Sequence, residues 1–168
     1  VHYAALYKLP SVYDVLDSYR ENSKADFHQT VADMAKIPRI QAKTINLGLF
    51  YGMGKGKLQA ELGVTKEKAA ELFHTYHSRV PFVKQLMDKA SNRAQERGQI
   101  RTLLGRLCRF HLWEPNRFGM HKALPHEEAL REHGPGIKRA YTYKSLNKLI
   151  QGSAADMTKK SMLELYKE

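Results

Sequence analysis

The spacing of apolar residues along the first part of the chain predicts helices. Residues 25–36 carry apolar side chains at three- and four-residue steps, as one face of an amphipathic helix requires. A first helical turn tolerates proline, and we expect the helix that Pro38 opens to run to about Met53. The same periodicity continues from Thr65 to Arg79 and from Pro81 to Gly98. The pattern therefore indicates a series of packed helices before its first change of period.

The periodicity changes after residue 98. The segment 99–113 has two apolar runs on either side of a Gly-Arg pair, which predicts a β-hairpin with mostly basic polar positions. Residues 114–136 contain three prolines and three glycines, and we expect a long loop with about one turn of helix. From Ile137 a long helix is expected to reach the end of the chain. The predicted fold class is mainly α: a helical bundle with one small β-hairpin and a long C-terminal helix.

The helix expected to open at Pro38 carries a stripe with a cationic end and an aromatic end. Its members recur at four-residue steps: Arg39, Lys43, Leu47 and Tyr51. Each such step rotates about 40° and climbs about 6 Å along an α-helix, so the four side chains form one slowly drifting line. A nucleoside triphosphate also has an anionic end and a flat, stackable end. The same spacing fits an ordinary amphipathic helix whose cations are solvated and whose Leu47 and Tyr51 are packed in the core.

The charge of the chain indicates what kind of partner it binds. There are 28 Lys and Arg residues against 17 Asp and Glu, a net charge of +11, which favours a polyanion and nucleic acid before a membrane surface. No run of 18 apolar residues and no leader sequence occurs, so we expect neither a membrane span nor secretion. The single cysteine, Cys108, fits a reducing compartment. We expect a cytoplasmic location, in the host cytoplasm if the source is viral.

Both ends of the sequence look cut. The chain begins on Val1 without a methionine and ends inside an amphipathic pattern that is not complete. We therefore expect it to be a fragment of a longer protein.

Four segments of the chain, in this order, resemble sequence motifs of one enzyme family. They are Asp26-Phe27-His28, the pattern Arg-x3-Lys-x3-Leu-x3-Tyr-Gly over 39–52, the hairpin sequence RTLLGRLCRF (101–110), and N-x3-QGSAAD over 147–156. Family A DNA polymerases carry similar segments in this order and at similar spacing. The second segment resembles their motif B, the fingers helix that holds the incoming nucleotide. The short interval from His28 to Arg39 resembles the phage-type branch, and the resemblance covers essentially the whole chain.

This resemblance implies that the cationic end of the stripe binds the incoming nucleotide. Arg39 and Lys43 would neutralise the triphosphate, and His28 would approach the same phosphates. Lys43 is also the candidate catalytic residue, as general acid or electrostatic clamp for the leaving pyrophosphate. Leu47 would pack against the sugar and base, at a position where Phe or Tyr is usual in the family. That departure leaves sugar discrimination open.

The resemblance also implies a set of residues that contact DNA: Tyr51, Gly52, Arg106, Arg109, Asn147 and Gln151. The tyrosine would stack at the templating position, and the glycine after it would let the template base approach. The two arginines of the hairpin would meet backbone phosphates. The two amides, one helical turn apart, can donate to minor-groove acceptors that every correct base pair presents. Without the resemblance, a solvated helix face explains these two amides better than a contact with DNA.

We expect the metal ligands in parts of the parent enzyme outside this sequence. The resemblance implies Mg²⁺ as the cofactor of the parent enzyme, held by carboxylates of a DYSQ-x-E-x-R-like motif and an HDE-like motif. Neither motif occurs in this sequence, so we expect no metal ligand here and no polymerisation by this chain alone. The expected partners are a DNA primer-template, deoxynucleoside triphosphates, and the remaining palm and thumb of the parent polymerase.

The resemblance implies a division into three parts: fingers helices at 1–98, a basic hairpin and loop at 99–136, and a long helix at 137–168. Two alternatives remain open. A fragment of a single-subunit phage-type RNA polymerase shares the R-x3-K spacing and the terminal Tyr-Gly, although NLGLFYG and QGSAAD favour the DNA enzyme. A non-catalytic, basic, helical DNA-binding module would bind DNA without preferring nucleoside triphosphates.

Overall fold

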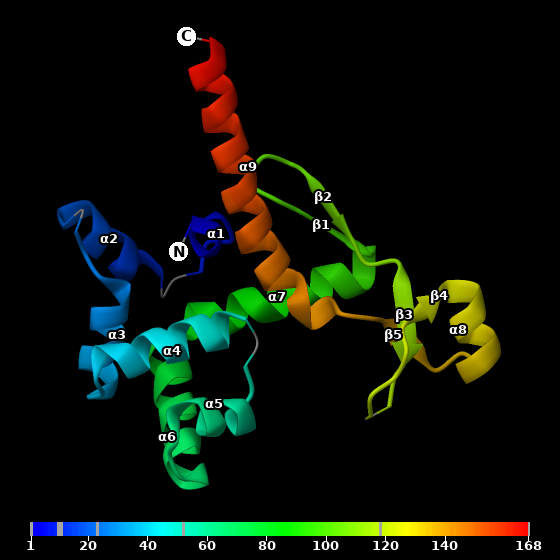
Figure 1. Cartoon of the computed structure of the whole chain (residues 1–168), viewed down its shortest axis with the longest axis horizontal. Coiled ribbons are helices and arrows are strands. Elements are labelled where there is room, and N and C mark those ends of the chain that lie inside the picture. The colour runs from blue at the N-terminus through cyan, green and yellow to red at the C-terminus, as the bar shows by residue number, and fades with distance from the viewer. Residues whose placement is uncertain (1, 10–11, 23, 52, 118, 168) are drawn as a thin grey trace. The chain divides into compact units, whose positions relative to one another are not determined.

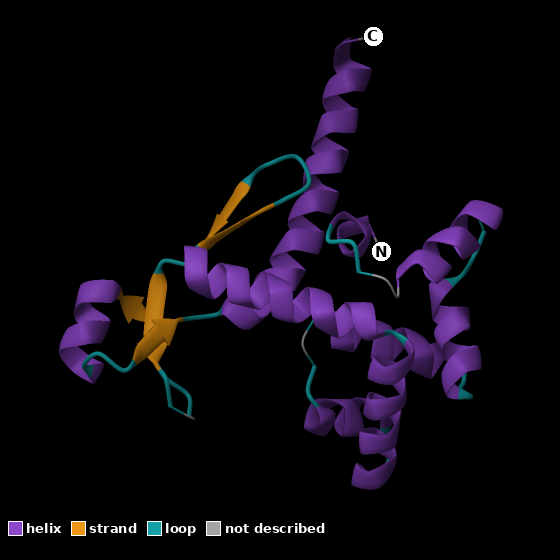
Figure 2. Cartoon of the chain, turned by 180° about the vertical axis from the view of Figure 1, so that it is seen from behind, coloured by secondary structure: helices purple, strands orange, loops and turns teal. Residues whose placement is uncertain are grey.

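The computed structural model describes five stretches of the chain: residues 2–9, 12–22, 24–51, 53–117 and 119–167 (Figure 1). The chain forms two compact units, residues 1–88 and 89–168. The predicted mainly α fold is confirmed, and among the described residues strands occur only after residue 98 (Figure 2). Within the same residues, no helix combines the length and the apolarity that crossing a bilayer needs.

Local residues set the ends of the helices in the first unit. These helices are α1 (His2–Leu6), α2 (Tyr13–Glu21), α3 (Phe27–Ala35), α4 (Arg39–Phe50), α5 (Lys55–Leu62), α6 (Lys66–Arg79) and the first part of α7 (Pro81–Arg97). Asp26 and Thr65 cap α3 and α6 by accepting backbone N–H groups. Gly63 ends α5 in the left-handed conformation, with φ of 63°, which glycine adopts at little cost. The helix expected from Thr65 to Arg79 is therefore present as α6.

The core of the first unit lies among α3, α4, α5 and α6. Helix α4 contacts both α3 and α5, and α6 contacts the same two helices. Ala42, Ile45 and Leu49 share one face of α4 and are buried. Leu58 of α5 and Leu72 of α6 are buried as well. Burial of this face fixes which positions of α4 remain on the surface.

The predicted β-hairpin is present in the second unit. Strands β1 (Gln99–Arg101) and β2 (Leu107–Arg109) pair antiparallel, with Ile100 opposite Cys108. The hairpin lies beside the long helix α9 (Ser145–Lys167), as Figure 1 shows. Ile100 is buried, and so are Leu146 and Leu149 of α9.

The second unit also contains a small sheet that was not expected from the sequence. Strand β3 (Leu112–Pro115) lies between β4 (Leu124–Pro125) and β5 (Ile137–Arg139), and both pairings are antiparallel. Helix α8 (His126–His133) connects β4 to β5. The expectation of a long loop over 114–136 with one helical turn is therefore wrong, because these residues contribute to strands and to an eight-residue helix.

The long C-terminal helix is confirmed, but it begins at Ser145 and not at Ile137. Ile137–Arg139 pairs with β3 instead, and the guanidinium of Arg139 stacks 4.5 Å from the centre of the Trp113 ring. Tyr141 then takes the left-handed conformation, with φ of 62°, before a short 3₁₀ turn leads into α9. Pairing with a strand distant in sequence thus overrides the helical pattern over these residues.

Candidate functional site

Helix α4 presents the predicted stripe on the surface of the first unit. All four of its residues are exposed: Arg39, Lys43, Leu47 and Tyr51. Leu47 is 43% exposed and Tyr51 is 40% exposed, so neither is part of the buried core of this unit. The alternative in which these two side chains are packed inside does not describe α4. Gly52, which the resemblance also selects, lies outside the described residues.

An ion pair ties the cationic end of the stripe to the start of α3. Arg39 donates from Nε to Oδ2 of Asp26 at 2.7 Å, and its Nη2 lies 2.5 Å from the same oxygen. The other oxygen, Oδ1, accepts the backbone N–H groups of His28 and Gln29. The hydrogen bond from Arg39 holds the pKa of Asp26 below its ordinary value, which favours the charged carboxylate. One side chain therefore caps α3 and orients the first guanidinium of the stripe.

A second link between α3 and α4 involves His28. Nδ2 of Asn46 lies 2.9 Å from Nδ1 of His28, and the Asn46 side chain is 1% exposed. Arg39 and Asn46 are seven residues apart on α4, which is about two helical turns, so they lie on the same side of the helix. His28 was selected from a separate motif, and the structure places its ring in contact with α4, the helix that carries the stripe.

A pocket of about 430 Å³ lies beside the aromatic end of the stripe, within the range of small-molecule sites. It is lined by Thr44, Leu47, Gly48, Tyr51, Met53, Gly54, Lys57 and Glu61. Gly48 leaves room for Met53, because a Cβ at position 48 would lie 2.7 Å from Sδ of Met53. The spacing of the stripe did not select Met53, Lys57 or Glu61, because they follow the motif and reach the pocket only when the chain folds back.

The hairpin of the second unit is fastened to α9 through one carboxylate. Asp156, which is 8% exposed, accepts hydrogen bonds from Oγ1 of Thr102 at 2.5 Å and from Nε of Arg106 at 2.6 Å. These two bonds, that of Thr102 first, lower the pKa of Asp156. Nη2 of Arg106 also donates to the backbone oxygen of Gly152, and the Leu103 N–H donates to Oγ of Ser153. The QGSAAD segment therefore binds the hairpin, through hydrogen bonds from Thr102, Leu103 and Arg106.

The predicted DNA-contacting residues of the second unit occupy different environments. Arg106 is half exposed, but two of its nitrogens are engaged by α9. Arg109 is exposed at the end of β2. Asn147 and Gln151 both lie in α9, one turn apart as expected, the first partly exposed and the second exposed. Lys148 between them reaches the hairpin, with Nζ 4.4 Å from the centre of the Phe110 ring.

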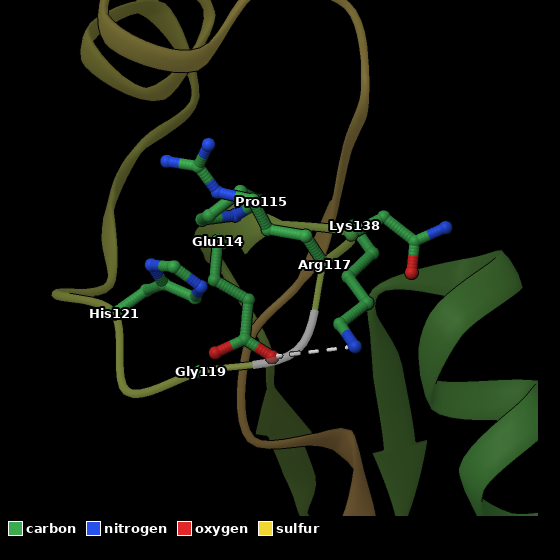
Figure 3. A pocket seen from close by; sticks show the side chains of 7 residues that line it. Glu114, Pro115, Arg117, Gly119, His121 and Lys138 are labelled. Atoms are coloured by element: carbon green, nitrogen blue, oxygen red, sulfur yellow. Dashed lines mark ion pairs between the residues drawn. The ribbon is translucent and has the colours of Figure 1, made fainter.

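A further pocket in the second unit lies beside the unexpected sheet. Its volume is about 330 Å³, and it is lined by Glu114, Pro115, Asn116, Arg117, Gly119, His121 and Lys138. Figure 3 shows the Glu114 carboxylate and the Lys138 ammonium pointing toward each other, and their closest atoms are 3.9 Å apart. Because cationic and anionic groups face each other here, we assign no ligand to this pocket.

The described residues offer no site for the implied Mg²⁺. Among them, no group of three or more His, Cys, Asp or Glu side chains could hold a metal ion. Asp156 is occupied by Thr102 and Arg106, and Asp26 is paired with Arg39. We therefore derive no step of a reaction through a metal held by these residues.

Comparison with known proteins identifies relatives over nearly the whole chain. The family model described as DNA polymerase family A matches residues 8–168. A DNA-directed DNA polymerase of Pseudomonas phage M6 is 32% identical over 97% of this chain and 28% of its own length. DNA polymerase I of Geobacillus stearothermophilus is 31% identical over 89% of this chain and 15% of its own length. The chain thus spans less than a third of these relatives, and the predicted likeness to phage enzymes is confirmed.

A solved structure agrees with the sequence relatives. It is described as the POL domain of Pol1 from M. smegmatis in complex with DNA primer-template and dNTP. It matches 82% of this chain and 23% of its own, with a TM-score of 0.60 and 26% sequence identity. The order of the four motifs, the exposed stripe of α4 and these similarities lead to one conclusion: the chain belongs to DNA polymerase family A.

Proposed function

We propose that this chain is the fingers portion of a template-directed DNA polymerase, in which α4 binds the incoming deoxynucleoside triphosphate. The observation that supports this most directly is the exposure of the whole stripe of α4 above a buried opposite face. Two exposed cations at one end and two exposed large side chains at the other match the two ends of a nucleotide. The related solved complex with primer-template and dNTP supports the same ligand class.

In this proposal the chain supplies charge and position. Arg39, Lys43 and His28 neutralise the triphosphate, and Lys43 protonates or stabilises the leaving pyrophosphate. Leu47 packs against the sugar and base of the nucleotide, and Tyr51 stacks at the templating position. Closure of α4 onto a correct base pair is an induced-fit step that admits chemistry only with the matching nucleotide.

We propose that the second unit holds the primer-template. Asn147 and Gln151 donate to minor-groove acceptors without reading sequence. Arg109 meets backbone phosphates, which position the duplex. Arg106 is proposed to do so through Nη1, since its Nε and Nη2 are bonded to Asp156 and Gly152.

The metal-dependent half of the reaction is proposed to lie outside this chain. Family A polymerases use Mg²⁺, and the described residues provide no carboxylate cluster for it. The bound metals would activate the attacking primer hydroxyl and screen the phosphates. On this basis residues 1–168 alone are expected to bind DNA and nucleotide weakly and to extend no primer.

The test is primer extension by the full-length gene product that contains residues 1–168. On a DNA template with Mg²⁺, the proposal predicts templated incorporation of deoxynucleotides in preference to ribonucleotides. Arg39→Ala should raise the dNTP concentration needed for half-maximal rate by about tenfold or more, as expected for loss of a charge-assisted hydrogen bond. Preferred incorporation of ribonucleotides would support the RNA polymerase alternative. DNA binding without extension would support the non-catalytic module, and either result would refute the proposal.

A further inference from the structure

Asn46 is a buried polar residue in the middle of α4. Its side chain is 1% exposed, and Nδ2 lies 2.9 Å from Nδ1 of His28 on α3. Oδ1 of the same amide is buried and has no hydrogen-bond partner within the described structure. A half-satisfied buried amide stabilises a fold less than an apolar side chain of the same shape. Packing alone therefore does not account for an amide at this position, whereas the contact with His28 does.

The donor and acceptor roles in this contact depend on the tautomer of His28. With Nδ2 of Asn46 toward the ring, the amide NH₂ group donates, and Nδ1 of a neutral His28 accepts through its lone pair. In a neutral imidazole the proton then lies on Nε2. In this tautomer the Asn46 amide holds the ring through Nδ1, and Nε2–H is the donor that remains.

The backbone of His28 is held as well. Its N–H donates to Oδ1 of Asp26 at 2.9 Å, and Asp26 is in turn paired with Arg39. The side chain is partly exposed, and no hydrogen bond of Nε2 occurs among the described residues. Within the part of the chain that the structure describes, the hydrogen bond to the His28 ring is therefore made at Nδ1.

We propose that Asn46 is a positioning residue for nucleotide binding, which acts through His28 by aiming Nε2–H at the phosphate oxygens of the incoming triphosphate. Asn46 itself touches no nucleotide in this arrangement. The inference rests on the proposed function, since it takes from there the contact between His28 and phosphate.

A double-mutant cycle in the full-length gene product tests this role. Single-turnover primer extension gives the dissociation constant of the incoming dNTP and the maximal rate for wild type, Asn46→Leu, His28→Ala and the double variant. We expect Asn46→Leu to raise the dissociation constant about five- to tenfold, with a smaller change in maximal rate. In the His28→Ala background the same substitution should change it by less than about twofold. An equal rise in both backgrounds would overturn the proposal.

Two controls separate positioning from damage to the fold. Gln29→Leu makes a similar amide-to-leucine change at an exposed position next to His28 and should leave nucleotide binding unchanged. The melting temperature of Asn46→Leu should equal or exceed that of wild type, because the substitution removes an unsatisfied buried oxygen. A weaker dNTP affinity that came with a lowered melting temperature would point to a structural role and contradict the proposal.

A spectroscopic readout distinguishes failure of this inference from failure of the proposed function. Two-bond ¹H–¹⁵N spectra of His28, recorded where its ring is neutral, should show a protonated Nε2 and an unprotonated Nδ1. Asn46→Leu should mix the two tautomers. A protonated Nδ1 in the neutral wild-type ring would overturn the inference directly. The expected spectrum combined with unchanged dNTP binding by His28→Ala would instead refute the phosphate contact, and with it the role of Asn46 in nucleotide binding.

Discussion

At the scale of single residues, Asp26 combines two tasks that substitution can separate. One carboxylate oxygen caps α3, and the other pairs with Arg39. Asp26→Asn keeps an N-cap acceptor and removes the charge, whereas Asp26→Ala removes both. We expect the urea midpoint to fall for the alanine variant and to stay near the wild-type value for asparagine, because partly exposed ion pairs add little stability. Equal destabilisation by both variants would contradict this division.

Sequence spacing was sufficient to identify the stripe on α4 but not the contacts that support it. Four-residue steps place Arg39 and Tyr51 on one line of any α-helix, so no tertiary information is needed. The pairing of His28 with Asn46 joins residues 18 positions apart and depends on how α3 packs against α4. Such packing has no local signature, and the contact between Asn46 and His28 therefore emerged only from the structure.

At the scale of elements, the packing of the hairpin against α9 depends on Gly152, which has no side chain. A Cβ on Gly152 would lie 2.9 Å from Cγ2 of Thr102 and 3.1 Å from Nη2 of Arg106. We expect Gly152→Ala to lower the free energy of unfolding by about 1–3 kcal/mol, as overpacking does, with loss of hydrogen-exchange protection in β1 and β2.

Gly56→Ala is the matched control for this substitution. Gly56 lies inside α5, and a Cβ there would meet nothing within 4 Å. Helix propensity then predicts a gain of about 0.5–1 kcal/mol in the free energy of unfolding. Urea denaturation of both variants gives the comparison. Stabilisation by Gly152→Ala would show that the hairpin does not pack on α9 as described.

The hydrogen bonds that Asp156 accepts from the hairpin predict that the stability of the protein depends on pH. Hydrogen bonds from Thr102 and Arg106 hold the pKa of Asp156 below its ordinary value of 3.8. Because the folded-state pKa is lower than the unfolded-state value, this contribution to stability is present above about pH 4 and is lost as the pH falls through the folded-state pKa. Asp156→Asn should therefore lower the urea midpoint at pH 7, and the difference from wild type should shrink in acid. A difference independent of pH would contradict this account.

The helices and the second sheet differ in how far the sequence could predict them. The helix ends are marked by residues close to them in sequence. Helices begin at or directly after Asp26, Thr65 and Pro81, and α5 ends before Gly63. Strands β3, β4 and β5 have only two to four residues each, too few to show an alternating pattern. Their pairing also spans a helix, so composition suggested a loop where the structure has a sheet.

At the scale of the whole molecule, the net charge of +11 should govern binding to DNA. Neutralised phosphates release counterions, so the logarithm of the binding constant falls linearly with the logarithm of the salt concentration. We expect Arg109→Gln to weaken duplex binding by the full-length gene product and to reduce this slope by about one. Arg131→Gln, an exposed arginine on α8, is the matched control. Equal slopes for Arg109→Gln and the control would argue against a phosphate contact at Arg109.

The central claim is that the exposed stripe of α4 holds the triphosphate during nucleotide transfer. Its most direct test is the single-turnover incorporation rate of Lys43→Ala in the full-length gene product, with Lys66→Ala on the surface of α6 as the matched control. If Lys43 stabilises the charge that develops on pyrophosphate, the maximal rate should fall about 10²- to 10³-fold, while the control should remain near wild type. A Lys43→Ala enzyme with an unchanged single-turnover rate would contradict this account.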